Sequence, residues 1–410
     1  MYSKCIWLLE NRSMSVQLIF DFIFHIGPII ISFCFPEVTI FFHGLAIILL
    51  FYEIIFSRIH IAELRTSNNC TIPSGYSHPV IRYYRAFVMM CVCCAIFAVD
   101  FQIFPRRFAK TETFGTSLMD IGSGTMTLCN GMAAGFKWMY HSKSSYTEFW
   151  RHTVAPVTML FALGITRSVV LKLLNYHEQV IEYGVHWNFF ITLAGVQSLY
   201  GIILYIVQKK IPCQMTYFTL ILFGLFIAYI HHYFLSHWHF DSYILSSERA
   251  DNFISMNKEG IFSLAGYLSL YFLGAAVGRL LFMEPFMKQL TVLSLITLFS
   301  WIALLLASSE PSRRIVNVAY IAWILSCNCF ILFGLFLIQI QLQKTLPLSF
   351  ILEATASSQL VIFLAANLLT GVFNISMENS QNARSFSDIL YILVYMVLLS
   401  SLSVKLLANI

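Results

Sequence analysis

Long apolar segments separated by short polar loops fill the 410-residue chain. A transmembrane helix needs about 20 apolar residues to cross a hydrocarbon core of ~30 Å, and windows of that length recur along the whole sequence. The pattern predicts about twelve to thirteen spans. The windows lie at 16–35, 38–57, 82–101, 116–136, 153–174, 186–208, 216–235, 261–283, 289–308, 315–341, 358–376 and 387–408. Because the loops between them are short, we expect an all-α, polytopic transmembrane helical bundle with no inserted soluble domain.

Composition narrows the functional classes. The chain is 58% hydrophobic and only 11% charged, against ~25% charged residues in a typical soluble domain. Its net charge of +5 is spread over short loops rather than gathered in a tail, which excludes a nucleic-acid-binding arm. We expect a single membrane-embedded domain over 1–410, which is either an enzyme or a multi-pass transporter. The sequence shows no strong internal repeat and few paired Gly/Pro breaks, and this weighs against the transporter.

The segment 98–124, AVDFQIFPRRFAKTETFGTSLMDIGSG, carries more charge beside a predicted span than any other part of the chain. It places Asp100 at the end of the third span and Lys110 in the loop that follows. Isolating a carboxylate at a membrane boundary is costly, so a carboxylate with nearby cations indicates a functional site. Two interpretations are open. One is an ion pair between Asp100 and Lys110 that closes the loop. The other is acid–base chemistry, in which a desolvated carboxylate removes a proton from a hydroxyl and the ammonium stabilises the developing negative charge.

Arg106 and Arg107 in the same loop also have two interpretations. They are either interfacial anchors whose aliphatic stems lie in lipid, or ligands for a phosphate. Lys and Arg counts in the alternate loops place the loop 102–115 on the luminal side, opposite to the more basic loops. Since three basic residues on that side run against the positive-inside rule, we expect them to serve a site rather than to set orientation.

Further polar positions lie inside or beside other spans. Asp120, in the fourth span, is expected to face the interior of the bundle. In 175–190, NYHEQVIEYGVHWNFF, a helix would bring Glu182 and His186 onto one face by the i, i+4 rule, close to Asn188. Such a segment is either the polar mouth of a cavity or a hydrated interfacial stretch.

Two late segments add candidates. Arg313 and Arg314, in SRRIVNVAYIAW, head a span and suit either a surface anchor or a lipid phosphate. In ANLLTGVFNISM, Asn367, Thr370 and Asn374 recur at helical spacing on one face and either line a cavity or bond to a neighbouring helix. The histidines of 231–239 have no interleaved carboxylates and fit no common zinc or di-iron spacing, so no metal site is expected.

Together these segments resemble the inositol acyltransferases of glycosylphosphatidylinositol (GPI) anchor biosynthesis, the PIG-W family. The resemblance rests on the segment that contains FPRRFAKTE and on NYHEQVIEYGVHWNFFITLA, NKEGIFSLAGYLSLYFL, SRRIVNVAYIAW and ANLLTGVFNISM, which look like the family's other blocks in the same order. These blocks lie within residues 80–376. Residues 1–75 carry no convincing match.

The resemblance implies an enzyme of the endoplasmic reticulum membrane. Such an enzyme transfers a fatty acyl chain, typically palmitoyl, from acyl-CoA to the inositol 2-hydroxyl of glucosaminyl-phosphatidylinositol. The resemblance also implies that Asp100 and Lys110 are essential and that the conserved loops are luminal. Acyl-CoA would be a co-substrate, with no permanently bound cofactor. We expect Asp100 to be the general base and Lys110 to orient it or stabilise the oxyanion. The residues expected to bind substrate are Arg106, Arg107, Asp120, Glu182, His186, Asn188, Arg313, Arg314 and Asn367.

Overall fold

A computed structural model of the chain describes residues 14–38, 79–140, 153–173, 180–210, 216–342, 349–376 and 386–408. All the regular structure in these ranges is helical, and ten of the described helices are long and apolar enough to cross a membrane. The expectation of an all-α polytopic bundle is therefore confirmed. The second predicted span lies outside the described residues from position 39 onward.

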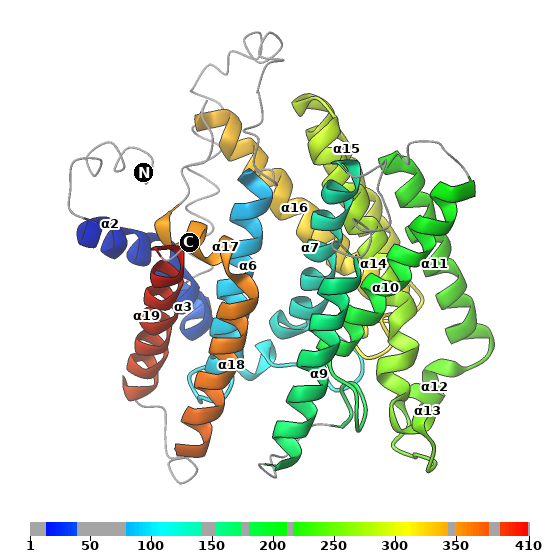
Figure 1. Cartoon of the computed structure of the whole chain (residues 1–410), viewed down its shortest axis with the longest axis horizontal. Helices are drawn as coiled ribbons and strands as arrows, with labels where there is room; N and C mark the ends of the chain where they lie inside the picture. Colours follow the sequence, from blue (N-terminus) through cyan, green and yellow to red (C-terminus); the bar gives the residue numbers. More distant parts are fainter. Residues whose placement is uncertain are drawn as a thin grey trace. The chain divides into compact units, whose positions relative to one another are not determined.

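The helices form two compact units (Figure 1). The first unit consists of Met1–Lys110 and Gly334–Ile410, and the second of Thr111–Phe333. The boundary in the first half of the chain falls directly after Lys110, inside the charged loop. A single acyltransferase domain over 1–410 stays a prediction.

The first unit is built on α6, which packs against α17 and α18, while α19 packs against the same two helices. The first predicted span is not one uniform helix, because a turn of π-helix separates α2 from α3. The bounds are α2 Met14–Asp21, η1 Phe22–Ile26, α3 Gly27–Cys34, α6 Pro79–Ala98, η2 Arg106–Phe108, α17 Phe350–Ser357, α18 Gln359–Ser376 and α19 Phe386–Ala408. The last residues of α16 also belong to this unit.

The second unit is centred on α14, which is buried along most of its length and packs against α7, α10, α11 and α15 (Figure 1). The bounds are α7 Leu118–Tyr140, α9 Ala155–Leu173, α10 Phe189–Lys210, α11 Tyr217–His237, α12 Phe240–Leu245, α13 Phe253–Met256, α14 Lys258–Met283, α15 Phe286–Leu305 and α16 Val318–Leu342. The connection between α11 and α14, residues 238–257, holds the two short helices α12 and α13.

Glycines on both helices set the close packing of α7 on α14. A Cβ atom on Gly131 would lie 2.2 Å from the carbonyl oxygen of Tyr271, and one on Gly274 would lie 2.3 Å from that of Leu128. Gly131 with Gly135 and Gly274 with Gly278 are two small-xxx-small pairs, which let helix backbones approach closely in a membrane. α7 is less apolar than the ten candidate spans, and this packing buries much of its surface against another helix.

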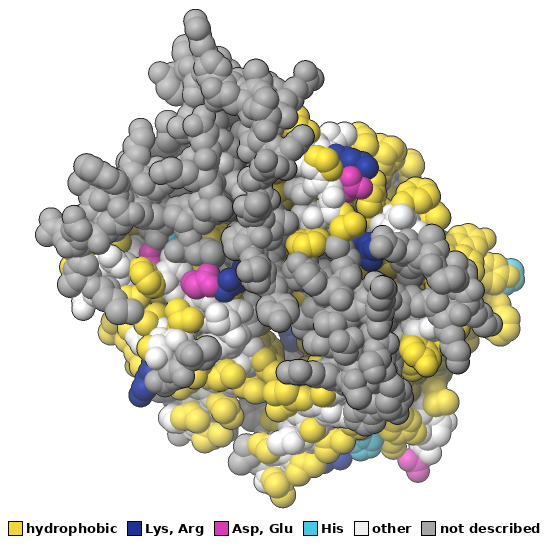
Figure 2. Space-filling view, turned by 45° about the horizontal axis from the view of Figure 1, so that its top comes forward, with side chains coloured by type: hydrophobic (Ala, Val, Ile, Leu, Met, Phe, Trp, Pro, Cys, Tyr) yellow, Lys and Arg dark blue, Asp and Glu magenta, His cyan; other side chains and the backbone are white. Residues whose placement is uncertain are grey.

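The outer faces of the described helices are apolar. On α11, Phe218, Leu222, Phe226 and Tyr229 are all exposed and recur at helical spacing. Figure 2 shows hydrophobic side chains over much of the described surface on one face of the molecule, with few charged groups among them. Such faces are suited to contact with lipid rather than with water.

Candidate functional site

Four loop segments converge at one end of the second unit. Backbone hydrogen bonds join residues 111–120 to 309–317 and residues 180–188 to 249–260, and ion pairs of Arg313 and Arg314 connect the two pairs of segments. The amide of Gly115 donates to the Pro311 carbonyl at 2.8 Å, that of Val185 to Met256 at 3.0 Å, and that of Gly260 to Tyr183 at 2.9 Å. Four of the blocks that the sequence analysis singled out therefore meet here, and their buried charged side chains form two ion-pair groups.

Asp120 lies at the centre of this end of the unit and is fully buried. Its Oδ1 accepts a hydrogen bond from Nε of Arg313 at 2.8 Å. Its Oδ2 accepts from the amide and hydroxyl of Thr111 and from the hydroxyl of Ser117, at 3.1, 2.8 and 2.8 Å. Ser117 also accepts from the Asp120 amide at the start of α7, in the manner of a helix-capping box. The prediction that Asp120 faces the interior is confirmed, and its carboxylate holds the loop, the helix start and Arg313 together.

The backbone of 311–317 holds the two arginines in place. Asn317 caps α16, because its Oδ1 accepts from the amides of Tyr320 and Ser312 at 3.0 and 3.1 Å. The ring of His231 hydrogen-bonds the Ile315 carbonyl at 2.8 Å. Val316 has a φ of +47°, a conformation that a β-branched residue adopts only under strain and that clusters at functional sites.

Glu182 reaches the same cluster but does not lie on a helix with His186. Its Oε1 is 3.8 Å from Nη2 of Arg313. The residues 180–188 form turns and bends, and Gly184 has a φ of +120°. A Cβ atom on Gly184 would lie 2.6 Å from Cα of Asn257. The predicted i, i+4 pairing is thus wrong, because the close approach to Asn257 requires a glycine in the left-handed region, and this interrupts the helix.

His186 and Asn188 have separate contacts. The side chain of His186 is exposed, its Nδ1 lies 3.2 Å from Nζ of Lys172, and its backbone amide donates to Asn257. Asn188 is buried and caps α10, because its Oδ1 accepts from the amides of Phe190 and Ile191 at 3.1 and 3.3 Å. Its Nδ2 donates to the carbonyl of Gly164 in α9, at 2.8 Å. All the polar atoms of the Asn188 side chain are therefore engaged in joining α9 to α10.

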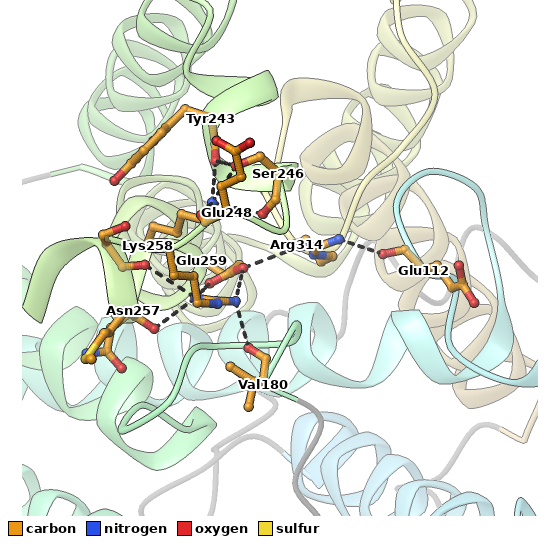
Figure 3. A network of polar contacts seen from close by, with 12 residues as sticks. Glu112, Val180, Tyr243, Ser246, Glu248, Asn257, Lys258, Glu259 and Arg314 are labelled. Carbon is orange, nitrogen blue, oxygen red and sulfur yellow. Dashed lines mark hydrogen bonds and ion pairs between the residues drawn. The ribbon is translucent and has the colours of Figure 1, made fainter. Parts of the chain in front are cut away.

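Arg314 belongs to a second buried ion-pair group (Figure 3). Its Nη1 donates to the Glu112 carbonyl at 3.2 Å, and its Nη2 lies 3.4 Å from Oε1 of Glu259. Nη2 and Nη1 of Arg249 donate to the two oxygens of the same carboxylate at 2.7 and 3.1 Å, which is a bidentate contact. Nε of Arg314 is buried and has no hydrogen-bond partner in the described part of the chain. Burial lowers the pKa of Arg314, while Glu259 opposes that shift.

Lys258 is fully buried next to Glu259, at the first position of α14. Its ammonium donates to the carbonyls of Tyr243, Ser246 and Glu248 at 2.7, 2.9 and 2.9 Å, and to the Ser246 hydroxyl at 2.7 Å (Figure 3). Three of these acceptors lie at or just past the carboxyl end of α12, where a helix presents unpaired carbonyls.

Sequence reasoning missed Lys258, Glu259 and Arg249 as site residues. The block NKEGIF contained a signal, because it puts two adjacent charges at the head of an apolar span. A chain of hydroxyls was also missed. Tyr267 donates to Ser123 at 3.0 Å, and the hydroxyl of Tyr320 lies 3.2 Å from that of Ser123. Tyrosines inside apolar spans are read from sequence as core or interfacial residues, and only packing shows that their hydroxyls meet.

Asp100 lies in the first unit, just after α6 ends at Ala98, and its side chain is exposed. Its Oδ2 accepts a hydrogen bond from Nδ2 of Asn374 in α18 at 2.9 Å. Partial burial beside the packed end of α6 raises the pKa of the carboxyl, while the hydrogen bond from Asn374 and the charge of Arg106 act in the opposite direction.

The Asp100 and Lys110 side chains do not form the pair that the sequence suggested. Both are exposed, and in the described residues no ion pair joins them. The predicted ion pair between Asp100 and Lys110 is therefore absent from the described structure, where α6 ends before Asp100 and leaves it in the loop. Arg106 folds back toward the end of α6, and its Nη1 donates to the Val99 carbonyl at 3.0 Å.

The other predicted substrate ligands of the first unit are exposed. The guanidinium of Arg107 lies 5.3 Å from the centre of the Phe108 ring. Nδ2 of Asn367 donates to the Phe363 carbonyl of its own helix at 2.7 Å. In the described ranges, no group of three or more His, Cys, Asp or Glu residues could hold a metal ion.

Comparison with known proteins places the chain in a family. It matches the GWT1 family model over residues 2–406. It is 30% identical to the phosphatidylinositol-glycan biosynthesis class W protein of Dictyostelium discoideum, over 89% of this chain and 82% of that protein. It is 34% identical to GPI-anchored wall transfer protein 1 of Schizosaccharomyces pombe, over 77% and 71% of the two chains. An uncharacterized protein of Arabidopsis thaliana is 32% identical over 96% of this chain and 88% of that protein. These matches confirm the resemblance seen in the sequence, and the chain belongs to the GWT1 family.

Proposed function

We propose that the protein acts in GPI-anchor biosynthesis as a membrane-bound O-acyltransferase. Two of its relatives are named for phosphatidylinositol-glycan biosynthesis and for GPI-anchored proteins. The proposed reaction transfers a palmitoyl chain from palmitoyl-CoA to the inositol 2-hydroxyl of glucosaminyl-phosphatidylinositol. The protein would carry it out in the endoplasmic reticulum membrane, with acyl-CoA as a co-substrate and no permanently bound cofactor.

The environment of the Asp100 carboxylate is the observation that chiefly supports this proposal. It is an accessible carboxylate with a raised pKa at the end of an apolar helix, and one of its oxygens accepts from a single side-chain donor. A carboxylate in that state is suited to accept a proton from a sugar hydroxyl, because its basicity is greater than that of an ordinary aspartate.

In the proposed step, Asp100 removes the proton of the inositol hydroxyl while the hydroxyl oxygen attacks the thioester carbonyl. The tetrahedral oxyanion is stabilised by the Lys110 ammonium, and the carbon–sulfur bond then breaks. The proton held by Asp100 passes to the departing sulfur, so the products are the acyl inositol and free CoA thiol. The sequence singles out no Cys or Ser as a nucleophile, so we favour direct transfer over an acyl-enzyme.

The charged end of the second unit supports a role in binding the polar parts of the substrates. Arg313 and Arg314 are both buried, and the buried Nε of Arg314 has no acceptor in the described structure. A phosphate or phosphodiester oxygen would supply that acceptor, and guanidinium groups suit it geometrically. Asp120 and Glu182 would orient Arg313, whereas the contacts of Asn188 give it a capping role.

One assay tests the function directly. The purified protein in detergent is mixed with radiolabelled palmitoyl-CoA and glucosaminyl-phosphatidylinositol, and lipid products are separated. We expect label in the lipid only when both substrates are present. Flux of lipid or solute in proteoliposomes without acyl transfer would instead support the transporter alternative. A stable covalent acyl intermediate on the protein would overturn direct transfer.

A further inference from the structure

Asn374 is the one side chain of α18 in hydrogen-bond contact with Asp100 in the described structure. The two residues are 274 positions apart, and their 2.9 Å contact joins the end of α6 to the last turn of α18 within the first unit. Asn374 is half-buried near the end of a mostly apolar helix. Polar side chains in such helices are costly unless they bond across to a partner.

Aromatic side chains pack beside both Asp100 and Asn374 and hold their contact in place. Phe101 directly follows Asp100, and Phe373 directly precedes Asn374, with their ring centres 5.6 Å apart. Phe97 adds edge contacts to both rings, with centres at 5.0 Å, and stacks on Tyr395 of α19 at 4.1 Å. Aromatic clusters of this kind are rigid and strongly packed, so the amide is held at a set position relative to the carboxylate.

Asn374 must be the donor in its hydrogen bond with Asp100. An ionised carboxylate only accepts hydrogen bonds, so the Asn374 amide nitrogen must face it. That donation stabilises the ionised form of Asp100 and opposes the effect of burial on the pKa. It engages Oδ2 alone, and Oδ1 has no hydrogen-bond partner in the described residues. One oxygen is therefore anchored while the other is available to a substrate hydroxyl.

We propose that Asn374 is a positioning residue for the reaction, which orients the Asp100 carboxylate and keeps it ionised while its second oxygen accepts the substrate proton. This inference rests on the proposed role of Asp100 as the general base. Asn374 itself does not touch the reacting atoms in this proposal. A purely structural tie between α6 and α18 would predict a loss of stability without a change in the ionisation of the base.

The experiment compares Asn374→Ala and Asn374→Asp with the wild-type protein and with Ser376→Ala. Ser376 is exposed on the same last turn of α18, and among the described residues its hydroxyl bonds to the Val372 carbonyl of its own helix. We measure kcat, the KM for palmitoyl-CoA and the pH dependence of kcat/KM in the radiolabel assay. Unfolding midpoints are recorded for each purified variant to show that it is folded.

The expected result for Asn374→Ala is a kcat about 10-fold lower or more, with KM changed by less than about 3-fold, because the lost bond acts on a charged catalytic group. The acidic limb of kcat/KM should move to higher pH by about half a unit or more. Asn374→Asp, nearly isosteric but negatively charged, should move the limb further, and Ser376→Ala should match wild type.

Wild-type kcat and an unmoved acidic limb in folded Asn374→Ala and Asn374→Asp would overturn the inference. Lowered stability with an unmoved limb would overturn it as well, and would identify a structural tie. Asp100→Asn separates these outcomes from failure of the proposed function. If Asp100→Asn is inactive while the Asn374 variants behave as wild type, only the positioning role fails. If Asp100→Asn retains full activity, both proposals fail.

Discussion

The two charged regions of the molecule differ in how their ionisable groups are held. In the second unit, Asp120, Glu259 and Lys258 are fully buried, and each is surrounded by several donors or acceptors. In the first unit, Asp100 and Lys110 are exposed, and the Asp100 carboxylate has one side-chain donor. Burial of a charge is strongly unfavourable unless it is paired, so these contacts stabilise the fold of the second unit. Asp100 and Lys110 are exposed, so the surroundings of both side chains can change when a substrate binds.

The largest expected effect is on stability, from breaking the buried network. Glu259→Ala leaves Arg249 and Arg314 without their carboxylate inside the protein, so we expect a loss of about 3–5 kcal/mol in unfolding free energy. Thermal unfolding in detergent, followed with a thiol-reactive dye that reads buried cysteines such as Cys129 and Cys329, measures it. Glu112→Ala is the control, since that side chain is exposed and only its backbone carbonyl contacts Arg314. An unchanged unfolding midpoint for Glu259→Ala would show that the buried network does not stabilise the fold, and the contrast between the two charged regions would fail.

The next effect is on turnover, with little effect on stability. Asp100→Asn and Lys110→Ala should each lower kcat by about 10²-fold or more, because they remove the base and the oxyanion partner. Their unfolding midpoints should stay near wild type, because both side chains are exposed. Gln102→Ala, an exposed change in the same loop, is the matched control. Near-normal activity in either charged variant would refute its assignment.

A smaller effect concerns pH. Only the ionised Asp100 accepts a proton, so wild-type kcat/KM should be constant above the pKa of that carboxyl and should fall as the pH drops through it. Burial has raised this pKa, and the charge of Arg106 holds it down. Arg106→Gln should therefore shift the acidic limb to higher pH, by about half a unit at low salt and less at high salt, since the site is exposed. A shift to lower pH would show that Asp100 is not the titrating base.

The smallest effect tests whether Asn188 acts as a cap or as a ligand. Asn188→Ala removes the acceptor for two amides at the start of α10, so we expect about 1–2 kcal/mol of lost stability. Asn188→Ser keeps a capping oxygen and should recover part of that loss. A raised KM with an unchanged unfolding midpoint would assign Asn188 to substrate binding instead.

The hydropathy pattern alone placed most of the helices. The predicted spans 153–174 and 387–408 are matched by α9 and α19 to within two residues at each end, because apolar windows of membrane length have few alternatives to helix. The prediction that a helix brings Glu182 and His186 onto one face was wrong. A contact between Gly184 and Asn257, distant in sequence, imposed a backbone that no local propensity reveals.

The candidate site was predictable as a set of segments and not as a set of contacts. Asp120 and Arg313 were both selected from the sequence, yet nothing in it indicates that they are bonded. Glu259 and Lys258 were missed because adjacent charges at a span boundary usually face solvent, and only packing shows that both are buried.

The sequence by itself determined that this is a helical membrane protein and which segments carry its polar chemistry, because hydrophobic length and isolated charges are properties of the chain alone. Tertiary structure alone decided which of those charges are satisfied and which are accessible. Burial and pairing depend on residues hundreds of positions apart, such as Asp120 with Arg313 and Asp100 with Asn374, and the free energy of each charge is set by those neighbours.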